Sequence, residues 1–169
     1  VEYIKVIDDG HGIPTEEVAV AFQRHATSKI DSEEQLDAIA TLGFRGEALP
    51  SIAAVSRSVI TTRQPLEPGG FRLELLWGET VSSGAQGCPA GTAVEVSDLF
   101  GNLPARRKFL RSSSAETSRI QELVSRYALV FPGIRFQLLV DGRVSFTSPG
   151  NGLPREALLA VYGPQAATS

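Results

Sequence analysis

Residues 2–14 of the chain read EYIKVIDDGHGIP, and this stretch decides which fold we expect. Residues 2–8 alternate around an apolar, β-branched centre, which predicts a buried strand. Residues 8–14 follow as a glycine-rich turn. Pro14 and Thr15 then open a helix whose first turn carries two glutamates, where acidic side chains suit the helix dipole. The stretch therefore predicts a strand, a tight turn and a helix in immediate succession.

The turn contains groups that could recognise a nucleotide base. Asp8 stands at the end of the strand, where its carboxylate can accept a hydrogen bond from an exocyclic amine. Gly10 and Gly12 allow a flat ring to approach the backbone closely. A string of the form D-x-G-x-G is by itself more often a plain tight turn, so the assignment needs support from the rest of the chain.

Further elements follow at regular intervals along the chain. Helical periodicity and capping signals predict helices over residues 14–26, 32–39, 47–55, 115–131 and 153–162, the last ended by Gly163. Strand patterns occupy residues 56–63, 71–77, 92–98, 134–140 and 143–147, and Asp141-Gly142 joins the last two in a hairpin. Residues 66–70 and 82–91 are expected to form turns or loops. The pattern predicts an α/β protein of the α+β type, a two-layer sandwich of helices on one face of a mixed β-sheet.

A second glycine-rich loop begins the sequence GFRGEAL at residues 43–49. Gly43 and Gly46 free the backbone, and the helix that follows presents unpaired N–H groups and a positive dipole end. This arrangement predicts a phosphate-binding loop, in which Arg45 either adds charge or pairs with a nearby acid. The chain contains no Walker sequence GxxxxGK[ST]. Pro50 is expected to remove a helical donor and to shift the start of the helix.

Two shorter patterns supply further candidate contacts. Thr92 begins a strand after Gly91, and its hydroxyl could reach a bound base directly or through water. Residues 98–111, DLFGNLPARRKFLR, contain the strongest basic cluster of the chain, and Pro104 suits the first position of a short helix. A solvated surface is the more common role of such a cluster. Its four cations are nevertheless candidates for contacts with DNA phosphates: Arg106, Arg107, Lys108 and Arg111.

The composition is that of a folded globular domain. Hydrophobic residues make up 42% and charged residues 21%, far from the balance of disordered chains. No apolar run approaches the roughly 20 residues that cross a bilayer. The single cysteine, Cys88, excludes an internal disulfide and a CxxC zinc site. Residues 1–50 carry ten acidic and four basic side chains (net −6), and residues 51–169 nine acidic and twelve basic (net +3), which allows a basic surface on an acidic chain.

Taken together, these strings resemble the MutL family. Five segments occur in the family's order and approximate spacing, at residues 8–13, 26–30, 43–49, 91–96 and 98–110. The glycine motifs are shared with the GHKL ATPase superfamily, which includes gyrase B, the heat-shock chaperone ATPases and histidine kinases. The strings ATSKI, GFRGEAL and DLFxNxPARRKFL are typical of MutL itself. The similarity covers nearly the whole chain and weakens after Ser148.

The resemblance implies a nucleotide site in a Bergerat ATPase fold, with ATP and Mg²⁺ as cofactors. Asp8 is similar to the family's adenine-binding carboxylate, with Gly10 and Gly12 beside the base and Thr92 supporting it. Residues 25–30 and the helix after them are similar to the mobile lid, with Lys29 near its start. The loop whose amides hold the phosphates is matched by Gly43, Phe44, Arg45, Gly46, Glu47, Ala48 and Leu49.

The resemblance also implies what this chain lacks. In the family, a helix upstream of the DxGxG strand carries the catalytic glutamate and a magnesium-binding asparagine. We therefore expect a fold that is incomplete at the N-terminus, with no catalytic residue and no metal ligand in this chain. Hydrolysis is expected of the full protein but not of this piece. Residues 1–148 are expected to form the ATPase domain, and residues 149–169 the start of the connection to the second, transducer domain.

The implied function is an ATP-binding and ATP-hydrolysing switch of DNA mismatch repair, acting as a nucleotide-gated DNA clamp and matchmaker. Implied partners are mismatched or single-stranded DNA, a MutS-type mismatch recognition protein and a second ATPase domain, with no membrane. The implied location is the cytoplasm, at the nucleoid in a bacterium. The alternatives are another GHKL ATPase and a nucleotide-independent DNA-binding module that uses residues 106–111. DNA binding that ignores ATP and survives loss of Asp8 would favour that module.

Overall fold

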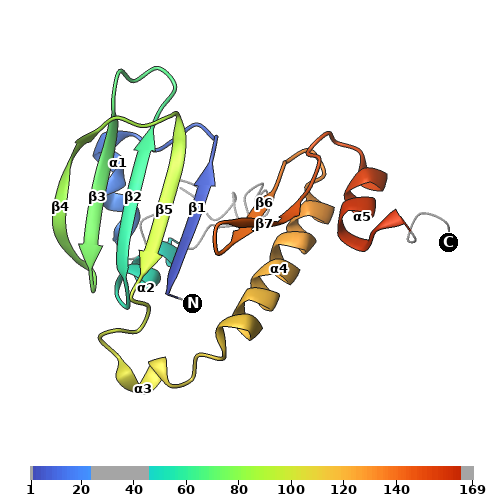
Figure 1. Ribbon diagram of the computed structural model, residues 1–169. Coiled ribbons are helices and arrows are strands. Elements are labelled where there is room, and N and C mark those ends of the chain that lie inside the picture. Colours follow the sequence, from blue (N-terminus) through green and yellow to red (C-terminus); the bar gives the residue numbers. More distant parts are fainter. Residues whose placement is uncertain (1, 24–45, 165–169) are drawn as a thin grey trace, which may run out of the picture. The chain divides into compact units, whose positions relative to one another are not determined.

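The computed structural model describes residues 2–23 and 46–164 (Figure 1). The chain divides into two compact units, one formed by Glu2–Phe109 and one that begins at Leu110. The expected domain boundary after residue 148 falls inside the second unit. As a division between functional domains it stays a prediction.

The first unit is built on a five-stranded sheet in the order β1-β5-β2-β3-β4 (Figure 1). Every pair in the described sheet is antiparallel, so the parallel pairs of a mixed sheet do not occur among the described residues. Four of the strands, β1, β2, β3 and β5, lie within two residues of their predicted positions, since their alternation is regular. The strands are β1 (Tyr3–Asp8), β2 (Arg57–Arg63), β3 (Gly70–Leu76), β4 (Glu79–Gln86) and β5 (Gly91–Ser97).

Short helices cover one face of this sheet, as expected (Figure 1). They are α1 (Thr15–Val18), the 3₁₀ helix η1 (Val20–Phe22) and α2 (Ala48–Ala53). The core between the layers consists of five buried residues from helices and strands, with Ile13, Phe22, Phe71 and Val94 packed around it: Val18, Ala53, Ile60, Leu73 and Leu75. The helix predicted at 32–39, and the end of the one predicted at 14–26, lie outside the described residues.

The prediction that β1 is buried is wrong for the described part of the chain. Val6 is 62% and Ile7 70% exposed, and Tyr3 is exposed as well. The cause is the strand's place at the sheet edge, where it pairs only with β5, while the described helices pack chiefly on β2 and β3. Apolar alternation predicts a strand correctly but does not say which strand has a partner on each face.

The strand β4 was not predicted, because residues 82–91 were expected to be a loop. Its sequence ETVSSGAQ has few apolar residues and is almost entirely exposed. A two-residue turn holds it against β3, with Trp77 at φ 54° and Gly78 at φ 88°. Two successive positive φ angles are those of a type I′ hairpin turn. The Trp-Gly pair carries only half of the usual sequence signal for this turn.

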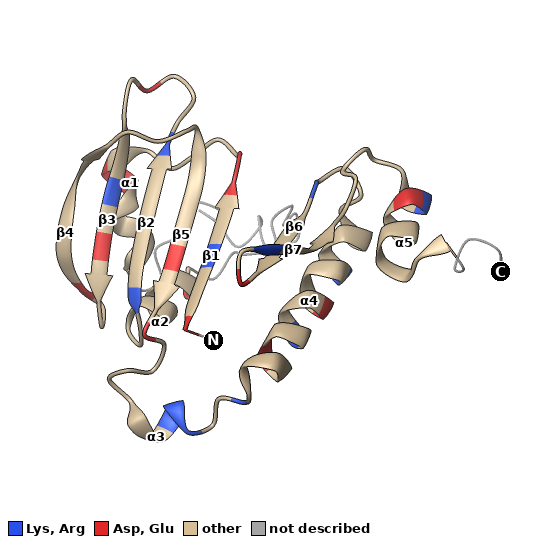
Figure 2. Ribbon diagram, viewed as in Figure 1, with Lys and Arg blue, Asp and Glu red and all other residues tan. Residues whose placement is uncertain are grey.

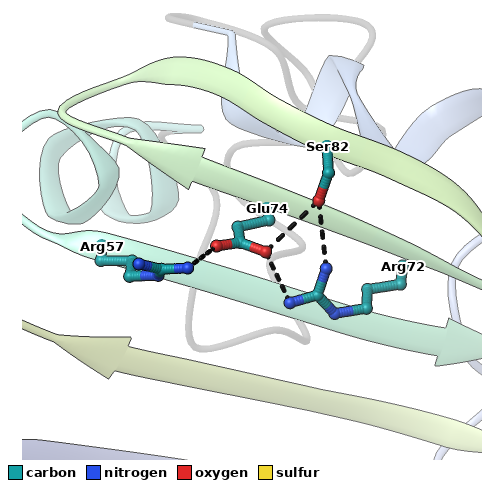
Figure 3. Close-up of polar contacts among 4 residues, drawn as sticks. All are labelled: Arg57, Arg72, Glu74 and Ser82. Carbon is teal, nitrogen blue, oxygen red and sulfur yellow. Dashed lines mark hydrogen bonds and ion pairs between the residues drawn. The ribbon is translucent and has the colours of Figure 1, made fainter.

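The other face of the sheet carries a buried carboxylate held by two arginines (Figure 3). Glu74 is only 6% exposed and pairs with Arg57 on β2, and with Arg72 at 2.7 Å. Ser82 on β4 donates to the same carboxylate at 3.3 Å and accepts from Arg72 at 3.2 Å. The hydrogen bonds from Arg72 and Arg57 lower the pKa of Glu74 below its usual value. The cluster joins three neighbouring strands by side chains as well as by backbone.

The second unit consists of a long helix, a hairpin and a shorter helix. These are α4 (Ser113–Val130), β6 (Gln137–Val140), β7 (Arg143–Thr147) and α5 (Pro154–Tyr162). The hairpin turn is the predicted Asp141-Gly142, with both φ angles positive, and Gly163 ends α5 as predicted. No helix of residues 2–23 and 46–164 is long and apolar enough to cross a membrane.

Candidate nucleotide site

The carboxylate of Asp8 is oriented by two backbone amides. Asp8 is the last residue of β1 and lies opposite Thr92 on β5. Its Oδ1 atom accepts hydrogen bonds from the N–H of Gly10 at 2.9 Å and from the N–H of Thr92 at 3.3 Å. Its Oδ2 atom has no hydrogen-bond partner among the described residues. The side chain is exposed, so the carboxylate can present an acceptor of fixed orientation to a ligand.

Two glycines beside this carboxylate leave room only for hydrogen. Gly12 has φ +69°, and a Cβ there would lie 2.3 Å from the carbonyl oxygen of Arg63. Gly91 has φ +111°, and a Cβ would lie 2.1 Å from the carbonyl oxygen of Asp8. Both positions combine a backbone conformation that favours glycine with a close approach of another strand. The turn after β1 is therefore packed directly against the ends of β2 and β5.

Thr62 fixes this packing and was not singled out by the sequence analysis. It ends the inward row of β2 and is 1% exposed. Its Oγ1 accepts a hydrogen bond from the N–H of Ile13 at 2.9 Å and donates to the carbonyl of Gly91 at 3.1 Å. The hydroxyl of Thr92 lies 3.1 Å away. One buried hydroxyl thus ties the glycine turn to two strands.

Strand register explains why these residues meet. Asp8 pairs with Thr92, and Thr92 pairs with Thr62, so the three lie in one row across β1, β5 and β2. Sequence separation hides this row, because the three positions are far apart in the chain. The structure brings together Asp8, Gly10, Gly12 and Thr92 as predicted, and adds Thr62. The exposed carboxylate of Asp8, beside the hydroxyl of Thr92, suits a ligand that carries an amine.

The predicted phosphate loop is described only in part. Lys29, Gly43, Phe44 and Arg45 lie outside the described residues, so their roles stay predictions. Gly46 has φ +61°, and Glu47 precedes α2, which begins at Ala48 and contains Leu49.

Pro50 does not disturb the start of α2, although it was expected to remove a helical donor there. It is the third residue of the helix, and the N–H of Ser51 is the first to bond back, to the carbonyl of Glu47 at 3.1 Å. The amides of the first helical positions have no acceptor within the helix in any case. Pro50 therefore removes no intrahelical hydrogen bond.

The basic segment forms a short helix, as Pro104 predicted. The helix α3 spans Pro104–Arg107, and Lys108 follows it directly. Its cations, Arg106, Arg107 and Lys108, are exposed and belong to the first unit, whereas Arg111 belongs to the second. The structure therefore groups three of the four candidate DNA contacts in one unit.

An antiparallel sheet with helices on one face is the architecture of the GHKL-type ATPase domains that this chain resembles. The solved structure of the Aquifex aeolicus MutL ATPase domain complexed with ADP matches with a TM-score of 0.73 and 31% identity, over 95% of this chain and 57% of that one. The MutL protein of Desulforamulus reducens is 49% identical over 160 residues, and that of Heliobacterium modesticaldum 51% over 160 residues. The chain belongs to the MutL family.

These relatives are much longer than this chain. The matched residues make up 95% of this chain but only 25% and 24% of the two MutL proteins. The chain thus spans about a quarter of the length of these relatives. No protein-family model matches the chain.

Proposed function

We propose that this chain is the nucleotide-binding part of an ATP-driven switch that acts in DNA mismatch repair. The observation that carries the proposal is the hydrogen-bonded row of Asp8, Thr92 and Thr62 beside two glycines that admit no side chain. The proposal is supported by the chain's likeness to proteins named DNA mismatch repair protein MutL and to a MutL ATPase domain complexed with ADP.

Each residue of the row has a distinct task in the proposed site. Asp8 accepts a hydrogen bond from the exocyclic amine of adenine, because its Oδ1 is already held by backbone amides and its Oδ2 is not. Gly12 and Gly91 let the turn after β1 pack directly against the ends of β2 and β5, which holds Asp8 in position for the base. The hydroxyl of Thr92 supports the base, and Thr62 acts through its neighbours by holding the turn in place.

The phosphates are assigned to the loop that precedes α2. Gly46 and Glu47 supply its described half, Ala48 and Leu49 follow as the first residues of α2, and the backbone amides of these four residues would face phosphate oxygens. Residues 43–45 and Lys29 complete the proposal from outside the described residues. An order–disorder change in such a segment, driven by phosphate contacts, is a common switching device.

Hydrolysis is proposed for the whole protein and not for this chain alone. We assign no general base to the described residues, since none of their carboxylates occupies the position that the family uses for its general base. No group of three or more His, Cys, Asp or Glu side chains that could hold a metal is gathered in residues 2–23 and 46–164. We therefore name no Mg²⁺ ligand there; Mg²⁺ bound with ATP would neutralise phosphate charge.

The wider role rests on the same family membership. Binding of ATP would order the lid and pair two ATPase domains into a clamp on DNA, which a MutS-type protein would recruit to a mismatch. These partners, and a location in the cytoplasm at the DNA, belong to the proposal. The alternative of another GHKL ATPase is disfavoured by identities near 50% to MutL proteins.

Calorimetric titration of the chain with a non-hydrolysable ATP analogue and Mg²⁺ tests the proposal. Asp8→Asn should abolish saturable binding, because the amide turns a donor toward the adenine amine or weakens the acceptor. Asp9→Asn is the matched control, since it removes the same charge from the next exposed position of the turn. Equal affinity of the two variants would remove Asp8 from the adenine role.

A nucleotide-independent DNA-binding module remains the second candidate. It is favoured by one observation, the three exposed cations of Arg106, Arg107 and Lys108 that form no ion pair with a described residue. DNA binding that is unchanged by ATP and by Asp8→Asn would support this candidate, whereas binding that requires the nucleotide would exclude it.

A further inference from the structure

The segment around α3 combines unbalanced positive charge with an exposed aromatic ring. Between Asp98 and Glu116 the sequence contains four cations and no acidic residue. Figure 2 shows blue and no red on α3. Within the first unit, Arg106, Arg107 and Lys108 make no side-chain hydrogen bond or ion pair with a described residue. Lys5, Arg57 and Arg72 of the sheet, in contrast, are each paired with a glutamate.

The ring of Phe109 stands in solvent directly after these cations. It is 86% exposed, more than any other large hydrophobic residue of the described chain except Leu66. Its backbone is nevertheless held, because its N–H donates to the carbonyl of Arg106 at 3.0 Å. A phenylalanine this exposed gains little from the protein's own core, and its ring is accessible to a ligand.

The loop before α3 anchors the segment to the first unit. The side-chain amide of Asn102 donates to the carbonyl of Ala54 at 3.0 Å, and the N–H of Phe100 donates to the carbonyl of Val55 at 2.7 Å. Gly101 lies against the ring of Trp77, where a Cβ would come within 2.5 Å. The cations and the ring are therefore presented by an ordered base, which lowers the entropy that binding must overcome.

We propose that Arg106, Arg107, Lys108 and Phe109 form a binding site for single-stranded nucleic acid, in which one base stacks on Phe109 and the cations contact the flanking phosphates. This site specifies the DNA contact of the proposed function and rests on it. Stacking requires a base whose face is free, which a single strand offers and a duplex does not. The four-residue helix α3 is also too short to read a duplex groove in the way that a recognition helix does.

Fluorescence anisotropy with a short labelled oligonucleotide, single-stranded or annealed to its complement, tests the site in the chain. Phe109→Leu keeps an apolar side chain but removes the ring, and it should weaken single-strand binding at least about fivefold, the lower end of the loss when one stacked base is removed. Duplex binding should change little. Phe109→Trp retains a flat ring and should bind the single strand at least as well as the parent chain.

Two variants that each remove one positive charge test the phosphate contacts. Arg107→Gln should reduce the slope of log affinity against log salt by about 0.7, the value for one phosphate contact with a single strand. Arg119→Gln removes the same charge from an exposed position on α4 and should leave the slope unchanged. The fluorescence of Trp77, the single tryptophan, monitors folding of every variant.

The outcomes separate this site from the nucleotide site. Equal single-strand affinity of the parent chain, Phe109→Leu and Phe109→Trp would overturn the proposal, and so would equal losses for single strand and duplex. An effect of Arg107→Gln without any effect of the ring would indicate an acidic protein partner or general charge attraction, and would also overturn it. ATP-analogue binding is measured on the same variants and should be unchanged, so a failure here leaves the role of Asp8 standing.

Discussion

Replacing Thr62 by valine should loosen the candidate site without changing its shape. Valine has nearly the volume of threonine but no hydroxyl, and Thr62 is buried. The substitution deletes the acceptor of the Ile13 N–H and the donor to the Gly91 carbonyl, at 2.9 and 3.1 Å, and the contact with the hydroxyl of Thr92. Valine cannot replace any of these contacts.

The magnitude follows from those lost contacts. A net contribution of roughly 0.5–1.5 kcal/mol for each hydrogen bond, and about 1–3 kcal/mol for a buried group left without a partner, sets the scale. The additional buried methyl group returns up to about 0.8 kcal/mol. We expect Thr62→Val to lower the free energy of unfolding by about 2 kcal/mol, and to weaken nucleotide binding because the turn after β1 is no longer held.

Urea unfolding followed by the fluorescence of Trp77, which lies in the same unit, measures the change. Thr61→Val is the matched control, since Thr61 precedes Thr62 on β2, points to the other face, and makes no side-chain hydrogen bond with a described residue. It should change stability by less than about 0.5 kcal/mol. Thr62→Ser keeps the hydroxyl and should retain most of the nucleotide affinity. Equal midpoints and slopes for Thr61→Val and Thr62→Val would refute the reasoning.

Two further substitutions test the site and the sheet. Gly91→Ala should destabilise the chain by several kcal/mol and abolish nucleotide binding, because Gly91 has φ +111° and the added Cβ would lie 2.1 Å from the carbonyl oxygen of Asp8. A Cβ at Gly87 would meet no atom within 4 Å, so Gly87→Ala should be tolerated. Thermal melts of the two variants compare these effects. Glu74→Gln should alter the acid limb of the stability profile. The pKa of Glu74 is lowered in the folded state, so its contribution is fully present above the ordinary value of 4.5 and is lost as the pH falls through the folded pKa. The difference in unfolding free energy between the parent chain and Glu74→Gln should shrink below pH 4.5; a constant difference down to acid unfolding would contradict this, and Glu79→Gln at an exposed position serves as control.

Local sequence signals predicted the elements that local chemistry determines. Three local features were predicted correctly because each depends on the backbone preference of one or two residues. They are the Asp141-Gly142 hairpin turn, Pro104 as the first residue of α3, and the end of α5 at Gly163. Helix α4 and strands β2, β3 and β5 followed from periodicity. Strand β4 was not predicted, since an edge strand that faces water needs no apolar alternation.

Site residues that are brought together only by the pairing of distant strands could not be predicted from the sequence. Asp8, Gly12 and Thr92 were predicted through motifs, but Thr62 has no motif of its own and gains its role from strand register. The exposure of Val6 likewise depends on which neighbours β1 has, and this is a property of the assembled sheet. The resemblance to a family predicted the nucleotide site, whereas the structure identified the residue that ties the glycine turn to two strands.

Base selectivity tests the central claim most directly. ATP and inosine triphosphate differ at the exocyclic position, where the adenine amine is replaced by a carbonyl oxygen, so only ATP can donate from that position to the carboxylate of Asp8. A site built around this hydrogen bond rejects a ligand that lacks the donor by a large factor, and we expect at least about a hundredfold weaker binding of inosine triphosphate in a calorimetric titration with Mg²⁺. Equal affinity of the parent chain for the two nucleotides would contradict the assignment of Asp8, Thr92 and Thr62 as an adenine site.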